Sequence, residues 1–116
     1  MSGIKEEIDR NLKAAEALKF IEDHKNDDDL VILDVRTPWE FSEGSISGAK
    51  NLDFTDPDFE NMVSELDKNK TYIVYCKTGK RSGMVEQFLK KHGFYDIYII
   101  LGGFEDFKKE LQKWTC

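Results

Sequence analysis

Cysteine, histidine and proline are scarce in this 116-residue chain, which has two of each. We expect the two cysteines, Cys76 and Cys116, to be reduced thiols in a cytoplasmic protein rather than a structural disulfide. His24 and His92 do not have the spacing relative to these thiols that a structural zinc site requires. The sequence therefore predicts a domain with neither a bound metal nor a cofactor.

Long apolar runs are absent as well. No segment approaches the roughly 18 apolar residues of a membrane span, and residues 1–10 lack the apolar stretch of a secretory signal. The net charge of −6 provides no general attraction to nucleic acid or to an anionic membrane surface. We interpret the densest acidic run, residues 27–29, as a solvated turn, because no neighbouring Asp or Glu completes a calcium site. We therefore expect no nucleic-acid or membrane partner.

The chain does contain enough apolar side chain for one core, since 40% of its residues are hydrophobic and 12% are aromatic. Its length is that of one ordinary domain, and it shows no internal repeat and no segment of low complexity. We expect residues 1–116 to form a single domain that is monomeric.

Helix-like and strand-like segments alternate along the chain. Apolar residues recurring at i, i+3, i+4 and i+7 predict helices, and short aliphatic or β-branched runs between turns predict strands. The predicted helices cover about residues 8–24, 39–41, 58–66, 83–92 and 104–114. The predicted strands cover residues 30–35, 49–52, 71–75 and 97–101. This alternation predicts an α/β fold with a mostly parallel sheet flanked by helices on both faces.

One segment, at the carboxyl end of the predicted strand 71–75, combines a nucleophile with features that favour anion binding. It reads Cys76-Lys77-Thr78-Gly79-Lys80-Arg81-Ser82. A loop between a strand and a helix N-terminus can turn several backbone N–H groups toward an anion, and glycine permits the backbone conformation that this needs. The three cations favour thiolate over thiol, and the thiolate is the nucleophile. The alternative is a buried structural cysteine followed by a basic turn, but it does not account for Cys, Gly, Arg and Ser together at this junction.

This segment resembles the active-site loop of the rhodanese (sulfurtransferase) family, whose pattern is Cys-x-x-Gly-x-Arg-Ser/Thr. Three further stretches resemble family motifs and occur in the family's order. They are Leu33-Asp34-Val35-Arg36-Thr37-Pro38-Trp39-Glu40-Phe41, Gly44-Ser45-Ile46-Ser47-Gly48-Ala49-Lys50-Asn51-Leu52 and Leu101-Gly102-Gly103-Phe104. The resemblance covers about residues 30–114 and implies the rhodanese-like fold.

The resemblance also implies a mechanism. Cys76 would attack the outer sulfur of a small anionic donor such as thiosulfate, become a persulfide, and pass the sulfur to a thiol or to cyanide. The amides of residues 77–82 would bind the persulfide, and Lys80 and Arg81 would attract the donor. Asp34 and Arg36 are interpreted as supports of this loop, although Arg36 could instead pair with Glu40. A thiol or persulfide protein such as thioredoxin or a cysteine desulfurase is the expected partner.

Two other functions are possible on the same fold. The first is a non-catalytic persulfide carrier or interaction module, although regulatory relatives often lack the cysteine that is present here. The second is a phosphatase or arsenate reductase, whose loop has five residues between Cys and Arg. Only four intervene between Cys76 and Arg81, and the smaller loop favours sulfur.

Some residues have a less certain place in this hypothesis. Ser45 stands where the family commonly has His, which leaves the packing beside the site open. Cys116 is interpreted as an incidental terminal thiol, with resolution of a persulfide as the alternative. Trp39 and Trp114 are expected to be core or partly buried residues. Phe54 and Phe59 are expected to be packing residues too, with the pocket mouth as the alternative.

Overall fold

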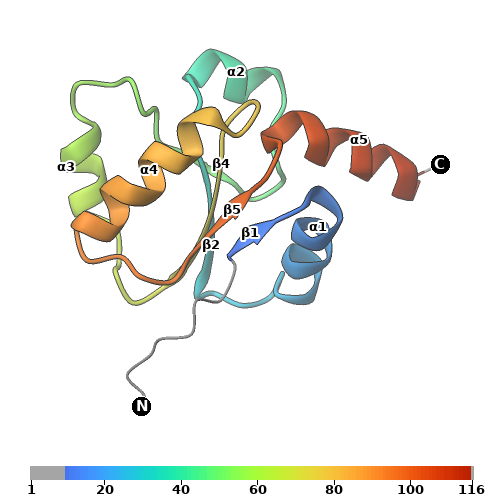
Figure 1. Ribbon diagram of the computed structural model, residues 1–116, viewed down its shortest axis with the longest axis horizontal. Coiled ribbons are helices and arrows are strands. Elements are labelled where there is room, and N and C mark those ends of the chain that lie inside the picture. The colour runs from blue at the N-terminus through green and yellow to red at the C-terminus, as the bar shows by residue number, and fades with distance from the viewer. Residues whose placement is uncertain (1–9, 116) are drawn as a thin grey trace.

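A five-stranded sheet runs through the middle of the protein, and the computed structural model describes residues 10–115 (Figure 1). The strands lie in the order β1-β5-β4-β2-β3, and every described pair is parallel. The elements in chain order are β1 (Asn11–Leu12), α1 (Ala14–Asp23), β2 (Leu30–Asp34), α2 (Pro38–Glu43), β3 (Lys50–Asn51), α3 (Phe59–Ser64), β4 (Thr71–Tyr75), α4 (Lys80–Lys91), β5 (Ile97–Ile100) and α5 (Gly103–Thr115). This arrangement confirms the predicted α/β fold.

Both faces of the sheet are apolar, because the central strands carry large hydrophobic side chains at consecutive positions. Along β4, Tyr72 and Val74 point to one face, whereas Ile73 and Tyr75 point to the other, and all four are buried. A strand that is apolar on both sides requires cover on both sides, as is usual in parallel sheets. The continuous aliphatic runs in the sequence therefore correspond to strands that are covered on both faces, as predicted.

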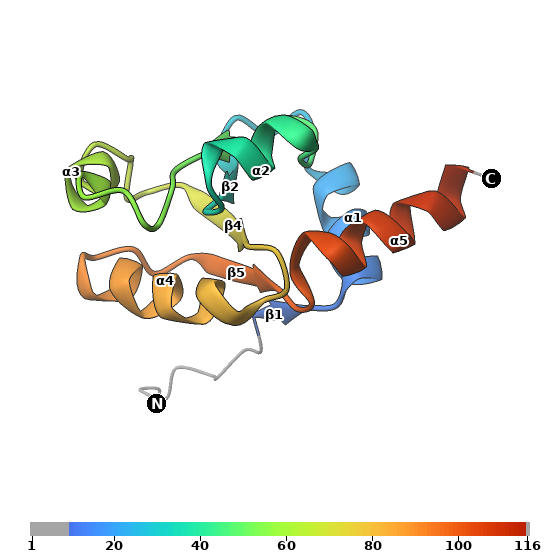
Figure 2. The same cartoon turned by 90° about the horizontal axis from the view of Figure 1, so that it is seen from above.

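Helices supply that cover in two layers. Figure 2 shows α3 and α4 on one side of the sheet and α1 and α5 on the other. The first layer closes a core cluster over β2, β4 and β5, and α3 and α4 contribute to it through Phe59, Val63, Val85 and Leu89. The second layer contributes Ala17, Leu18 and Phe107 to the other cluster. The prediction of helices on both faces is confirmed, and Phe59 is a core residue rather than part of a pocket mouth.

The prediction was wrong at the N-terminal helix. We expected a helix over residues 8–24, but α1 begins at Ala14, and residues 11–12 form the edge strand β1. Residues 8 and 9 lie outside the described part of the chain. The edge strand is held by long-range bonds, since the Ile99 amide donates to the Arg10 carbonyl and the Leu101 amide to the Leu12 carbonyl. Such pairing depends on the tertiary fold, and a two-residue strand carries no periodicity.

Two tryptophans are exposed, contrary to expectation. The side chains of Trp39 on α2 and Trp114 on α5 are 71% and 61% exposed. Trp39 follows Pro38 in the first turn of α2, a helix with no buried residue. Trp114 lies at the end of α5, and Figure 1 shows the last turns of this helix projecting from the body of the protein. The apolar stripe of α5 therefore extends beyond the core that its first turns cover.

The order of the strands determines where a ligand can bind. From β2 the chain crosses to β3 on one side, and then returns to place β4 on the other side of β2. A crevice forms outside the carboxyl ends of strands at such a switch point, and ligands of open α/β sheets bind there. The two carboxyl ends that meet at this point are those of β2 and β4.

Within residues 10–115, no helix has the length and apolar character required to cross a bilayer.

Candidate active site

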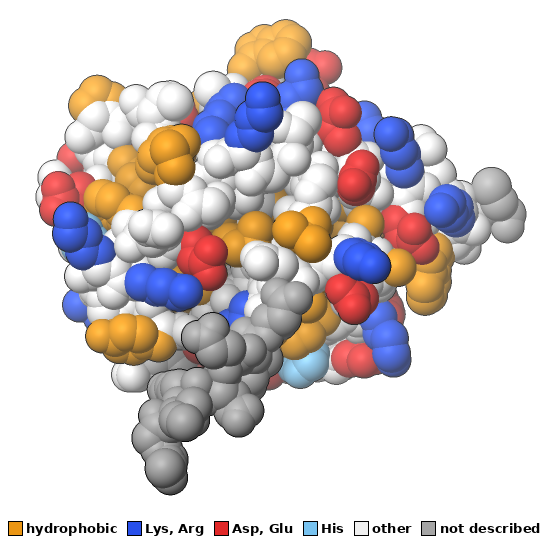
Figure 3. Space-filling model, viewed as in Figure 1, with side chains coloured by type: hydrophobic (Ala, Val, Ile, Leu, Met, Phe, Trp, Pro, Cys, Tyr) orange, Lys and Arg blue, Asp and Glu red, His pale blue; other side chains and the backbone are white. Residues whose placement is uncertain are grey.

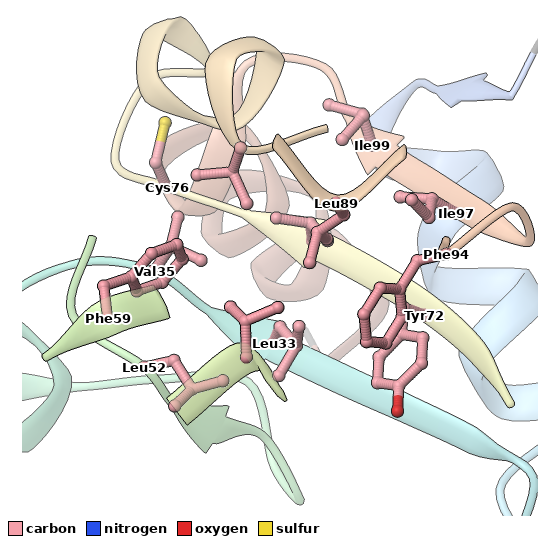
Figure 4. Packing of buried hydrophobic residues seen from close by; sticks show 13 residues of the cluster. Leu33, Val35, Leu52, Phe59, Tyr72, Cys76, Leu89, Phe94, Ile97 and Ile99 are labelled. Carbon is pink, nitrogen blue, oxygen red and sulfur yellow. The ribbon is translucent and has the colours of Figure 1, made fainter. Parts of the chain in front are cut away.

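Cys76 follows the last residue of β4 and lies at the switch point. Its residue is only 2% exposed, and Figure 4 shows its sulfur pointing out of the hydrophobic cluster toward the loop that leads to α4. We call residues 76–82 the cysteine loop. The Gly79 amide donates a hydrogen bond to the Cys76 Sγ atom over 3.0 Å, and the Ser82 hydroxyl lies 4.0 Å from the same sulfur. The sulfur is thus held inside the loop by a backbone donor.

Gly79 enables this closure. Its φ of +101° lies in the left-handed region, where a residue with a Cβ atom is strained. The turn brings the Gly79 amide back to the sulfur, and the Ser82 hydroxyl donates to the Gly79 carbonyl over 3.0 Å. Helix α4 begins at the next residue, Lys80, so the positive end of its dipole also faces the loop. The sequence predicted this role of Gly79.

The cysteine loop is positively charged on its outer side. Lys77 and Lys80 are exposed and Arg81 is half-buried. None of these three cations forms an ion pair with another residue of the described chain. Figure 3 shows basic side chains gathered over the N-terminal end of α4. This arrangement makes the electrostatic potential at the loop locally positive, although the protein as a whole is acidic.

The carboxyl end of β2 carries a buried ion pair. The Arg36 Nη2 atom donates to an Asp34 carboxylate oxygen over 2.6 Å, and the Arg36 Nε atom donates to the same carboxylate. Arg36 and Asp34 are 4% and 0% exposed. Burial lowers the pKa of Arg36, but its hydrogen bonds to Asp34 and the charge of that carboxylate outweigh this and raise the pKa above its ordinary value. Arg36 is therefore a fixed cation.

This pair braces a neighbouring loop. Arg36 also donates to the Gly44 carbonyl over 2.6 Å, while Glu40 instead accepts from the Thr37 amide as the cap of α2. Arg36 therefore forms no ion pair or hydrogen bond with Glu40, contrary to the alternative, and the Glu40 charge makes only a smaller contribution to the raised pKa of Arg36. No hydrogen bond joins Arg36 or Asp34 to the cysteine loop among the described residues, so their support of that loop stays a prediction.

The loop that contains Ser45 is anchored by other residues. The Ile46 amide donates to the Tyr75 hydroxyl over 3.0 Å, and Arg36 holds Gly44. Burial raises the pKa of Tyr75 well above its ordinary value, which keeps the hydroxyl neutral. These contacts hold the loop on either side of the half-buried Ser45. The absence of the family's usual His therefore leaves the loop anchored.

Sequence reasoning missed one contact of the cysteine loop. The first turn of α5 meets its start, where the Phe104 amide donates to the Cys76 carbonyl over 2.8 Å and the Glu105 amide donates to the Lys77 carbonyl over 3.2 Å. The paired glycines before Phe104 form a recognisable motif, but nothing in their spacing indicates which loop they touch. Beside this junction lies a shallow depression of about 230 Å³. Its lining includes the exposed Trp39 together with Lys77.

No metal site accompanies this loop in the part of the chain that the structure describes. Within residues 10–115, no three His, Cys, Asp or Glu side chains gather as metal ligands. Cys76 is the one free cysteine of this range, whereas Cys116 lies outside it. The prediction that Cys116 is incidental therefore stays a prediction.

The protein is thus a parallel α/β domain with a cysteine at the switch point of its sheet, and a loop that leads into a helix encloses this cysteine. The chain belongs to the rhodanese-like domain family, whose model matches residues 14–110. This match confirms the resemblance inferred from the motifs.

Two named relatives illustrate the range of the family. The chain is 36% identical over 80 residues to a thiosulfate sulfurtransferase GlpE of Coxiella burnetii (strain RSA 331 / Henzerling II), covering 69% of this chain and 73% of the relative. It is 32% identical over 89 residues to a tRNA uridine(34) hydroxylase of Pelagibacter ubique (strain HTCC1062), covering 76% of this chain and 30% of the relative. The chain thus spans less than a third of that hydroxylase.

Solved structures agree with the fold. A rhodanese-related protein from Thermoplasma volcanium superposes with a TM-score of 0.72 at 28% identity, covering 87% of this chain and 92% of the other. Most of its length is therefore shared with this chain. Both sequence and structure thus support membership of this chain in the family. The two named relatives show that the family includes proteins with different activities.

Proposed function

We propose that this protein is a sulfurtransferase that carries sulfur on Cys76. The main support is the enclosed position of the Cys76 sulfur. It lies inside a basic loop at the switch point of the sheet and accepts a hydrogen bond from the Gly79 amide over 3.0 Å. A thiolate in such a place is both a good nucleophile and a good leaving group. The named thiosulfate sulfurtransferase among its relatives supports the same chemistry.

The reaction has two steps. The Cys76 thiolate attacks the outer sulfur of thiosulfate, so a new S–S bond forms at Cys76 while the bond to the sulfite sulfur breaks and sulfite leaves with its electron pair. Cyanide or a thiolate then attacks the terminal sulfur of the persulfide, and the Cys76 thiolate is the leaving group. The free enzyme is restored without an external oxidant or reductant.

The residues of the cysteine loop have separate tasks in this scheme. Backbone amides of residues 77–82 bind the negatively charged terminal sulfur, since hydrogen bonds to a charged group are stronger than neutral ones. Lys80 and Arg81 draw the donor anion to the loop. The four residues between Cys76 and Arg81 make a cradle that suits one sulfur atom better than a tetrahedral phosphate or arsenate.

A direct test follows the sulfur atom. The protein is incubated with thiosulfate, its mass is measured for one added sulfur, and thiocyanate is then assayed after addition of cyanide. We expect both signals in the wild-type protein and in Cys116→Ser, and neither in Cys76→Ser. Loss of both signals in Cys116→Ser, or their persistence in Cys76→Ser, would contradict the assignment.

The same experiment separates the two alternatives. Sulfur loading without turnover would identify a persulfide carrier, and failure of both loading and turnover in the wild-type protein would leave an interaction module. Release of phosphate from an aryl phosphate would instead identify a phosphatase. In the cell we propose a cytoplasmic monomer that exchanges sulfur with a small anionic donor and with a thiol or persulfide protein.

A further inference from the structure

The cysteine loop is in contact with the turn between β5 and α5, which lies far away in the sequence. The two hydrogen bonds from the Phe104 and Glu105 amides end on the first two carbonyl groups of the loop, those of Cys76 and Lys77. Donors at the start of a helix have no partner within the helix, so they are available for such contacts. Here they bind the protein's own backbone.

These bonds determine the orientation of two peptide planes. The described chain contains no cis peptide bond, and in a trans peptide the C=O of one residue and the N–H of the next point in opposite directions. Because the Cys76 and Lys77 carbonyls point toward α5, the amides of Lys77 and Thr78 point away from it. Helix α5 packs on one face of the sheet, whereas Cys76 belongs to the core cluster on the opposite face. Both amides are thus turned away from α5, toward the face of the sheet whose core cluster includes Cys76.

Gly103 makes this close approach possible. Its φ is +61°, and a Cβ atom at this position would lie 2.5 Å from the Cys76 carbonyl oxygen and 2.6 Å from that of Lys77. Both neighbours are backbone atoms and cannot rotate away. The loop and the turn also meet at Gly79, where a Cβ atom would lie 3.3 Å from the Gly102 nitrogen. The turn and the loop therefore interlock at two points.

We propose that the first turn of α5 is the positioning element of the cysteine loop. Gly103 allows the approach, and the Phe104 and Glu105 amides hold two carbonyls outward so that the Lys77 and Thr78 amides face the Cys76 sulfur. The importance of this turn for sulfur transfer rests on the proposed function. It concerns anion preference at the sulfur, which can be measured without any sulfur donor.

A pair of variants at one position isolates the backbone donor. Glu105→Pro removes the N–H that binds the Lys77 carbonyl, and proline is tolerated in the first turn of a helix. Glu105→Ala removes the same side-chain charge but keeps the N–H. Both are made in a Cys116→Ser background, and Cys76 is alkylated with anionic iodoacetate and with neutral iodoacetamide. The readout is the ratio of the two rates.

We expect the iodoacetate-to-iodoacetamide ratio to be about tenfold lower in Glu105→Pro than in Glu105→Ala, because a hydrogen bond to a charged group contributes on that order. General loosening of a buried cysteine would raise both rates by the same factor and leave the ratio unchanged. Equal ratios in the two variants would overturn the proposal. An absence of sulfur transfer with the expected ratio would overturn only the proposed function.

A second measurement needs no substitution in α5 and decides the question if Glu105→Pro does not fold. The ¹⁵N-labelled Cys116→Ser protein is alkylated at Cys76 with each reagent, which places either a carboxylate or an amide beside the loop. We expect the Lys77 and Thr78 amide protons to lie further downfield in the carboxymethyl form. Identical positions in both forms would overturn the inward orientation of these amides.

Discussion

The carboxyl ends of β2 and β4 are adjacent in the sheet, yet their charged residues differ in burial and in pairing. At the end of β2, the charges of Asp34 and Arg36 are buried and joined to each other. At the end of β4, Lys77 and Lys80 are exposed and form no ion pair with another described residue. The Cys76 sulfur in the same loop accepts a hydrogen bond from the Gly79 amide and lies near the Ser82 hydroxyl. The first end stabilises the scaffold, whereas the second keeps its charge available for a ligand.

The largest effect is expected from Arg36→Leu. This change leaves the buried Asp34 carboxylate without its cation, and breaking a buried ion pair costs about 3–5 kcal/mol. Urea unfolding monitored by circular dichroism measures the loss in the free energy of unfolding. The matched change at the other strand end, Lys77→Ala, is expected to alter stability by less than about 0.5 kcal/mol, as is usual for surface substitutions. Equal losses in the two variants would remove the contrast.

The next effect concerns the hydroxyl that anchors the loop beside Arg36. Tyr75→Phe leaves the buried Ile46 amide without its acceptor, which costs about 1–3 kcal/mol. Burial raises the pKa of Tyr75 above its ordinary value of 10.0, so its contribution is present below pH 10 and is lost as the pH rises further. We therefore expect the difference in stability between wild type and Tyr75→Phe to shrink above pH 10. The buried Tyr72, whose pKa burial also raises, is common to both proteins.

At the end of β4 the expected effect is on catalysis. Arg81→Ala removes one cation of the cysteine loop, so kcat/KM for thiosulfate should fall about tenfold, and its salt dependence should weaken. Lys91→Ala, at the far end of the same helix, serves as the matched control and should leave both quantities unchanged. A loss of the same size in both variants would indicate that the net charge of the protein matters, and that the position of Arg81 in the loop does not.

Much of this architecture could be predicted because it is recorded in local patterns. The strands β2, β4 and β5 are continuous apolar runs, and such runs reflect burial on both faces of a sheet. The cysteine loop is local as well, since seven consecutive residues contain the proposed nucleophile, the glycine of the turn and the start of a helix. Local chemistry could therefore indicate the site before its surroundings were known.

The features that sequence reasoning missed depend on contacts between distant segments. The edge strand β1 exists because of bonds to β5. Arg36 pairs with Asp34 because Glu40 is engaged as the cap of α2, where it accepts from the Thr37 amide. Trp39 has the composition of a core residue, but α2 buries none of its side chains. Hydrophobicity predicts that a residue favours burial, and the fold decides whether a neighbouring element covers it.

The smallest effect lies at the other end of α4, where His92 forms an exposed pair that differs from both strand ends. Its Nδ1 atom lies 2.9 Å from the Phe88 carbonyl, and its Nε2 atom lies 3.1 Å from a Glu60 carboxylate oxygen. The Phe88 carbonyl, followed by Glu60, raises the pKa of His92 above its ordinary value of 6.5. The resulting stabilisation is present below pH 6.5 and is lost as the pH rises through the raised value. NMR titration of the His92 ring protons should show a pKa above 6.5 that falls in Glu60→Gln without returning fully, because the Phe88 carbonyl remains. A pKa that does not respond to Glu60→Gln would mean that this surface pair, unlike the buried pair at β2, has no measurable coupling.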